Sequence, residues 1–278
     1  MTAALAVAML LAGPAPAEVR SVTVTFTDEK GAPVEGLVAE ELVVLENGVA
    51  REVARAEVDR RALTLALILD TSEAVGSAFR LTLVGAVESF LAQLPDGARY
   101  TLWATGDRAT KIAGPTTDRA EGARAVKRMF PRGGNTLLDT LVEACRELEP
   151  VEGQRSAIVI VTGVDQELSF RDRQKAVDEA RGAADVFMAV QFEGQGAAFE
   201  DRIRFEYVLE TLTRETGGLY ERPLSSMGAS AALQKISSEL RAPYRLAYAT
   251  LPEIKDRKIE VTVARPGVKA RVWPGKKP

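Results

Sequence analysis

The sequence predicts an α/β fold, in which a doubly wound and mostly parallel sheet is inserted into a small β-sandwich built from both chain ends. Between residues 63 and 240, strand patterns alternate with helical patterns, which is typical of a sheet covered by helices on both faces. Residues 63–69 and 156–161 are so apolar that both faces of each strand must be buried, as in a parallel sheet. At both ends of the chain the strand patterns return without helices between them.

The two ends contain short strands separated by turn residues. Asn47-Gly48 lies between two of them and is the strongest short-range signal for a hairpin. Because an isolated hairpin is only marginally stable in water, we expect the two ends to pair with each other. This gives a discontinuous sandwich domain of residues 19–60 and 241–275 around an α/β domain of residues 61–240. The expected strands at the two ends cover residues 22–27, 42–46, 49–58, 244–250, 258–264 and 269–273.

Within the α/β segment, the first strand is followed by a helix over residues 75–94, whose apolar side chains recur at helical spacing. The turn at Pro95-Asp96-Gly97 ends this helix. The second strongly apolar strand, which begins at Ser156, should lie beside the first. The other expected elements are strands 99–105, 109–113 at an edge, 185–192 and 219–221, and helices 118–130, 170–184, 198–216, 226–240 and one that carries Cys145.

The composition argues against several classes of function. The 278 residues include 36 Lys and Arg against 39 Asp and Glu, so no basic field is present to attract nucleic acid. There is no histidine, which removes the usual general base and the commonest zinc ligand, and an enzyme is therefore not expected. Cys145 is the single cysteine, so no disulfide forms within the chain, and we expect it to be buried as a small apolar residue. No glycine-rich phosphate loop follows a strand.

The first seventeen residues are expected to be a secretory signal peptide. An apolar core, too short to span a membrane, is followed by Ala15-Pro16-Ala17, which fits cleavage after Ala17. No basic residue precedes this core, so an Ala-rich extension or a misplaced start remains the alternative. The expected location is therefore outside the cell or in the periplasm, with neither a membrane span nor a lipid anchor.

Polar side chains follow the two apolar strands at the points where they end. Asp70 and Ser72 come directly after the first strand, and Asp165 follows the second. Thr136 opens a helix after a Gly-Gly-Asn loop. Ligands of open α/β sheets bind outside the carboxyl ends of the strands, so these residues suggest a cation site lined by oxygen atoms.

These loops resemble the metal ion-dependent adhesion site (MIDAS) of von Willebrand factor type A domains. The resemblance rests on Asp70-x-Ser72 after an apolar strand and on Gly-Gly-Asn-Thr136-Leu-Leu-Asp139 at the start of a helix. More narrowly, the chain resembles the secreted bacterial proteins called von Willebrand factor A related, first noticed in Acidobacteria. The family implies an adhesion-type module that recognises a protein partner without catalysis. The stretches that carry this second resemblance are residues 27–37, 44–48, 213–218 and 240–248.

The resemblance implies Asp70, Ser72 and Thr136 as metal ligands, but the sequence departs from the family pattern twice. Ala74 stands where a second hydroxyl is expected, and Gly163 stands where a second acid is expected. A single carboxylate retains Mg²⁺ or another divalent cation weakly. The sequence therefore predicts a degenerate site, with weak metal binding or none.

Asp165 is the one acid that could restore the site, since it lies two residues beyond Gly163 along the chain. Each other residue also has a structural interpretation: Asp70 and Ser72 as acceptors in a capping turn, and Thr136 as a helix N-cap. Asp139 fits the preference for acids in the first turn of a helix. Two functions remain open: an interaction module that uses these loops, or a structural and assembly protein in which the A domain is a metal-free scaffold.

Overall fold

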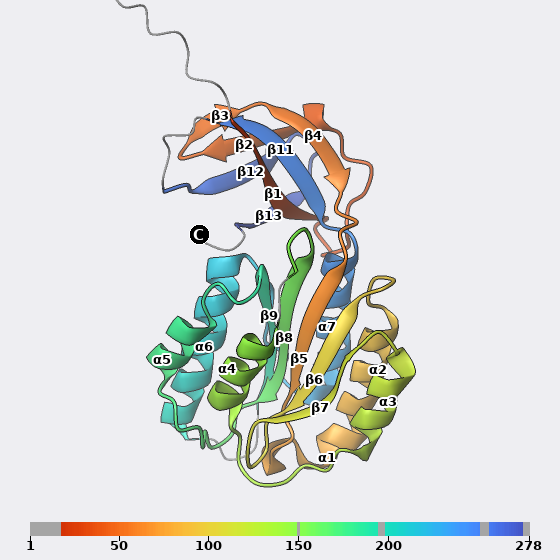
Figure 1. Ribbon diagram of the computed structural model, residues 1–278, viewed down its shortest axis with the longest axis vertical. Coiled ribbons are helices and arrows are strands. Elements are labelled where there is room, and N and C mark those ends of the chain that lie inside the picture. Colours follow the sequence, from red (N-terminus) through yellow and green to blue (C-terminus); the bar gives the residue numbers. More distant parts are fainter. Residues whose placement is uncertain (1–17, 149–150, 194–197, 251–255, 275–278) are drawn as a thin grey trace, which may run out of the picture.

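The computed structural model describes residues 18–148, 151–193, 198–250 and 256–274. It confirms the predicted α/β fold, with a mostly parallel sheet between two layers of helices and an antiparallel sandwich at one end (Figure 1). The predicted signal peptide, residues 1–17, lies outside the described residues.

One sheet forms the middle layer of the α/β part. Its strands are β5 (Leu63–Leu69), β6 (Arg99–Ala104), β7 (Thr110–Thr116), β8 (Arg155–Gly163), β9 (Val186–Phe192) and β10 (Tyr220–Glu221). They are ordered β10-β9-β8-β5-β6-β7, and all pairs are parallel except β6 with β7 at the edge. The two apolar strands β5 and β8 are neighbours, as the sequence predicted. All polar residues that follow parallel strands therefore reach the same edge of the sheet.

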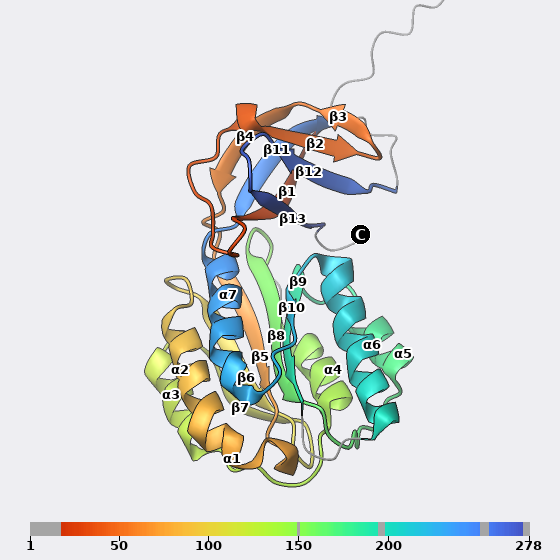
Figure 2. The same cartoon turned by 180° about the vertical axis from the view of Figure 1, so that it is seen from behind.

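Helices cover both faces of this sheet (Figures 1 and 2). One face carries α2 (Val84–Ala92), α3 (Arg119–Arg128) and α7 (Ala229–Arg241), and the other carries α4 (Leu137–Glu147), α5 (Arg173–Ala180) and α6 (Phe199–Thr216). Successive side chains of a strand point to opposite faces, so Leu65 and Leu67 of β5 pack with the first set, whereas Ala66 and Ile68 pack with the second. Burial on both faces explains why β5 is apolar from Leu65 to Leu69.

The helix expected over residues 75–94 is interrupted near its start. α1 (Gly76–Ala78) leads into a π-helical turn, Phe79–Leu83, before α2 begins. In the described residues, one stretch, Glu73–Ala92, is long and apolar enough by composition to cross a membrane. Large apolar side chains of this stretch, including Phe79, Val87 and Phe90, pack in the α/β core, whereas Leu81 is exposed.

Strands from both chain ends form the sandwich. They are β1 (Glu18–Thr27), β2 (Leu42–Glu46), β3 (Val49–Arg51), β4 (Val53–Val58), β11 (Tyr244–Thr250), β12 (Ile259–Val263) and β13 (Lys269–Trp273). One sheet has the order β13-β1-β11-β4 and the other the order β12-β2-β3. Each sheet thus contains strands from both ends, and Val24, Phe26 and Val44 share the core between the sheets.

The hairpin at Asn47-Gly48 is confirmed, with φ of 51° and 79° at the two turn residues. The single strand expected over residues 49–58 is wrong. The chain breaks at Glu52 into β3, which pairs with β2, and β4, which pairs with β11 in the other sheet. A strand that changes sheets closes the corner of the sandwich, and local alternation alone does not reveal the change.

The sandwich rests on the end of the central sheet at which β5 and β8 begin (Figure 1). Trp273 of β13 is buried in the α/β core. Gly217 ends α6 in the left-handed region, and a Cβ there would lie 1.8 Å from the carbonyl oxygen of Val272. The carboxyl ends of the parallel strands therefore lie at the far end of the molecule, away from the sandwich.

Candidate functional site

The carboxylate of Asp70 is the centre of a buried hydrogen-bond network at the carboxyl end of β5. Its Oδ1 accepts from the backbone N–H of Ser72 at 2.8 Å, and its Oδ2 accepts from the backbone N–H of Gly163 at 2.9 Å. Oδ2 also accepts from Nδ2 of Asn135 at 2.9 Å and from Oγ1 of Thr162 at 3.1 Å. One carboxylate thus joins the loop after β5, the end of β8 and the loop that opens α4.

Asp70 is 1% exposed, and this burial raises its pKa above the ordinary value. The hydrogen bonds from Ser72, Gly163 and Thr162 act in the opposite direction, because they stabilise the ionised form. An isolated buried carboxylate is costly, and these donors replace the water that it loses on folding. The network therefore holds the three loops together, in addition to being a candidate site.

The other predicted ligands lie in different surroundings. Oγ of Ser72 is buried and has no hydrogen-bond partner among the described residues. Oγ1 of Thr136 lies 3.5 Å from Oγ1 of Thr140, and the Thr136 carbonyl accepts from that same hydroxyl at 2.8 Å. Asp165 is half-buried and forms no hydrogen bond with Asp70 in the described part of the chain. The structure thus brings Asp70 and Ser72 together, places Thr136 one residue beyond Asn135, and leaves Asp165 outside the network.

The capping interpretation holds for Asp70, which accepts from the backbone N–H two residues ahead. It is wrong for Ser72 and Thr136, because each precedes a helical turn without a hydrogen bond from its side chain to the turn. Oγ1 of Thr136 lies instead beside Oγ1 of Thr140 in α4.

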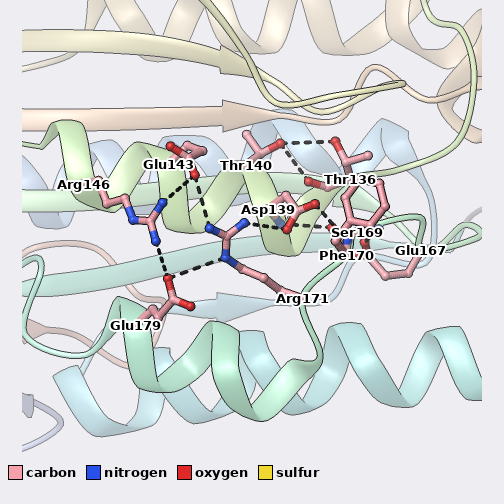
Figure 3. Close-up of polar contacts among 10 residues, drawn as sticks. All are labelled: Thr136, Asp139, Thr140, Glu143, Arg146, Glu167, Ser169, Phe170, Arg171 and Glu179. Atoms are coloured by element: carbon pink, nitrogen blue, oxygen red, sulfur yellow. Dashed lines mark hydrogen bonds and ion pairs between the residues drawn. The ribbon is translucent and has the colours of Figure 1, made fainter.

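Asp139 connects α4 to the loop after β8 (Figure 3). Its carboxylate accepts from the backbone N–H of Phe170 at 2.9 Å and pairs with Arg171 at 2.8 Å. The same guanidinium lies 3.3 Å from Glu143 and 3.6 Å from Glu179. Asp139 is therefore a structural acid in the first turn of α4, as the sequence interpretation favoured.

Asn135 and Thr162 are the members of the network that sequence reasoning missed. Asn135 is fully buried, and its amide donates to Thr162 at 3.1 Å as well as to Asp70. Its backbone also bridges to the loop after β8, where the N–H of Leu168 donates to the Asn135 carbonyl at 2.7 Å. Two features of the sequence could have indicated them: Asn135 follows two glycines, and Thr162 is a hydroxyl residue at the end of an apolar strand.

This donor set fits a divalent cation poorly. Both oxygens of Asp70 already accept hydrogen bonds, so N–H and O–H groups surround the only carboxylate of the network. A Cβ at Gly163 would lie 3.6 Å from Oδ2 of Asp70, but it would meet Phe192 at 3.0 Å and Val75 at 3.4 Å. Apolar side chains thus occupy the place of the second acid. Among the described residues, no group of three acidic or cysteine side chains could hold a metal ion.

Glu167 is a second buried acid beside this network. Burial raises its pKa to about 7, against the hydrogen bond that Oε1 accepts from the Ser169 N–H at 2.8 Å. Its Oε2 has no hydrogen-bond partner in the described part of the chain. A neutral side chain at this position should therefore stabilise the folded state at any pH at which the Glu167 carboxyl would be ionised.

Glu167→Gln is expected to raise the free energy of unfolding at pH 8 by about 2 kcal/mol and to change it little at pH 4. The folded-state pKa of about 7 lies above the ordinary value of 4.5, so the folded state binds more protons between these values. The stability that Glu167 contributes is complete below pH 4.5 and is lost as the pH rises through 7. Urea unfolding at both pH values measures this, with the exposed Glu200→Gln as control. A lower stability of Glu167→Gln at pH 8 would contradict the expectation.

The site offers hydroxyls, an amide and carboxylates, but no activated nucleophile among the described residues. Cys145 is buried in α4, and burial raises its pKa to about 12, so the thiol stays protonated near neutral pH. The chain contains no histidine that could act as a base.

Residues 65–166 match the family model of the von Willebrand factor type A domain. This segment contains all four predicted site residues. A search among curated proteins finds no match.

Several solved structures share the fold. Proximal thread matrix protein 1 from the mussel byssus, with a zinc-occupied MIDAS motif, is 17% identical, with a TM-score of 0.53 over 70% of this chain and 49% of that one. A von Willebrand factor type A protein from Catenulispora acidiphila is 12% identical, with a TM-score of 0.57 over 91% and 72%. The vWF domain of the pili tip protein Mfa5 from Porphyromonas gingivalis is 8% identical, with a TM-score of 0.50 over 64% and 94%.

The chain spans about half the length of the mussel protein, and at these identities the similarity concerns the fold. The matched segment runs from β5 to the loop after β8 and includes Asp70 at the end of β5. Residues 65–166 are therefore similar in sequence to a von Willebrand factor type A domain, and the α/β part has the fold of the solved structures named above.

Proposed function

We propose that the protein is a non-enzymatic, adhesion-type interaction module that contacts a protein partner through its carboxyl-end face. We define this face as the loops after β5, β6, β8 and β10, the loop between α3 and α4, and the first turn of α6. The observation that carries the proposal is the exposure of large apolar side chains there. Phe130, Phe170, Phe199, Leu224 and Met227 are all mostly exposed, and Phe170 is fully so. Large apolar side chains exposed on one face are typical of a protein-interaction site.

Recognition at this face is proposed to need no resident metal. The carboxylate of Asp70 is occupied by protein donors, and a chain with Gly163 and Ala74 supplies neither the second acid nor the second hydroxyl. The mussel structure named above holds zinc in its MIDAS motif, so the two sites would differ in this respect. Asp70 would then hold the loops in place for a partner rather than retain a cation.

We also propose that the protein belongs among the secreted bacterial von Willebrand factor A related proteins, and that it is exported after cleavage at Ala17. The stretches that carry this resemblance meet in the sandwich and at its joint with the α/β part. The backbone N–H of Leu37 donates to the hydroxyl of Tyr244 at 3.2 Å, which joins two of these stretches. Gly217, from a third, packs on the backbone of Val272. Because the stretches that resemble this family hold the sandwich together and join it to the α/β part, the contacts support a resemblance that extends over the whole chain.

A second candidate function is a structural protein whose sandwich makes the contacts. Val43 and Val49 are exposed on the three-stranded sheet, and β3 is a short edge strand. In that case the carboxyl-end face would be a scaffold.

Capture of partners from the medium or periplasm of the source cells separates the two candidates. We expect Phe170→Asp to lose the captured partner and Val49→Asp, the matched control on the sandwich, to retain it, because a buried charge in an apolar contact is costly. Capture should also survive EDTA. Loss in Val49→Asp with retention in Phe170→Asp would favour the second candidate, and loss in EDTA would contradict the metal-free mode.

A further inference from the structure

A cavity of about 560 Å³ opens on the carboxyl-end face beside the Asp70 loop. Thr71, the neighbour of Asp70, lines it, and so do three arginines, Arg108, Arg128 and Arg132. All three arginines are exposed. The volume is in the range of sites that take a small ligand or one or two side chains of a partner.

The positive charge of this cavity is only partly compensated. Arg132 lies 3.6 Å from Asp107, which also lines the cavity. Arg108 and Arg128 have no carboxylate within ion-pair distance among the described residues. One acid against three arginines leaves a net of two positive charges, in a chain whose formal net charge is −3. A local positive field in an acidic protein favours an anionic partner.

A second cavity on the same face is lined by an arginine whose charge is compensated within the chain. Its volume is about 510 Å³, and Arg171 is one of the residues that line it. There the guanidinium is held among the carboxylates of Asp139, Glu143 and Glu179 (Figure 3). That arginine is already neutralised within the chain, whereas Arg108 and Arg128 are available to a partner.

The wall of the first cavity is partly apolar. Phe130 and Met129 line it, and Phe130 is 66% exposed. The guanidinium of Arg80 lies 4.3 Å from the centroid of the Phe130 ring, which orients the ring and adds positive charge at the rim. An occupant that fits this wall combines a negative group with an apolar one.

We propose that this cavity binds an acidic segment of the partner protein, in which an aspartate or glutamate lies beside an apolar residue. The carboxylate pairs directly with Arg108 and Arg128, and the apolar side chain packs on Phe130. The planar guanidinium donates two parallel hydrogen bonds to a carboxylate, which gives both strength and orientation. This inference rests on the proposed function and assigns the chemistry of its partner.

The test is fluorescence anisotropy with the full chain and a labelled peptide, Gly-Phe-Asp-Glu-Gly. The matched peptide Gly-Phe-Asn-Gln-Gly lacks the charges. We expect the acidic peptide to bind, and R108E/R128E to weaken that binding by about tenfold or more. The control R60E/R99E changes the net charge equally at exposed arginines outside this face, and it should bind within about twofold of the unaltered chain. Circular dichroism and thermal unfolding verify that both double variants fold.

Four outcomes would overturn the proposal. Equal weakening in the two double variants would mean that only the overall charge matters, and equal binding of the uncharged peptide would remove the role of the carboxylates. Competition by inorganic phosphate at the same concentration as the peptide would indicate a general anion site. If the acidic peptide fails to bind while Phe170→Asp still abolishes partner capture, this inference fails and the proposed function stands.

Discussion

Asp70→Ala is expected to lower the free energy of unfolding by about 4 kcal/mol, the largest effect of any single substitution at the candidate site. The change removes the acceptor of two backbone N–H groups and of the side chains of Asn135 and Thr162. These donors are buried, so water does not replace the lost carboxylate. A loss of this size approaches the whole stability of many domains, and part of the protein should be unfolded at room temperature.

Urea unfolding followed by circular dichroism measures the effect, with Asp165→Ala as the matched control. Asp165 is half-buried and lies outside the network, so its replacement should change the free energy of unfolding by about 0.5 kcal/mol or less. Similar losses in the two variants would contradict the role of Asp70 in holding the three loops together.

Glu46→Ala is expected to destabilise the protein by about 3–5 kcal/mol. Glu46 lies in β2 with its side chain fully buried, and it pairs with Arg51 and Arg257, each at 2.9 Å. It also accepts from the hydroxyl of Thr250 at 2.6 Å. One carboxylate therefore joins the N-terminal strands to the C-terminal segment, and its removal takes this anion away from two largely buried guanidinium groups.

The effect of Glu46→Ala should also depend on pH. Burial acts to raise the pKa of Glu46, but the hydrogen bonds from Thr250, Arg51 and Arg257 outweigh it and hold the pKa below its ordinary value of 4.5. A lowered folded-state pKa means that the contribution is present above 4.5 and is lost as the pH falls through the folded-state value. Urea unfolding of Glu46→Ala and of the unaltered chain, at pH 7 and in acid, measures how the difference in their free energies of unfolding depends on pH.

The control for that experiment is Glu57→Ala on β4, in the other sheet of the sandwich. Glu57 pairs with Arg55 at 3.0 Å, but both side chains are largely exposed, so the loss should be about 0.5 kcal/mol or less. A difference between Glu46→Ala and the unaltered chain that stays the same from pH 7 into acid would count against a paired, ionised Glu46.

The sequence alone determined the fold class and the elements on which it depends. The apolar run from Leu65 to Leu69 required burial on both faces of β5. Asn47-Gly48 predicted a hairpin, because this local sequence strongly favours one type of turn. Pairing of the two chain ends followed from the instability of short β segments on their own. The sequence also predicted that Asp70 lies at the end of a strand. It showed that Ala74 and Gly163 stand where the family pattern has a second hydroxyl and a second acid.

Only the tertiary structure decided what these residues do. The bond from the Gly163 N–H to Asp70 spans 93 residues of sequence, and the bond from Thr250 to Glu46 spans 204, so no local pattern reports them. The change of sheet at Glu52 and the gathering of Arg108 and Arg128 around one cavity likewise depend on packing between distant segments. Local chemistry fixes which elements form, whereas a buried donor finds its acceptor only when the elements have packed together.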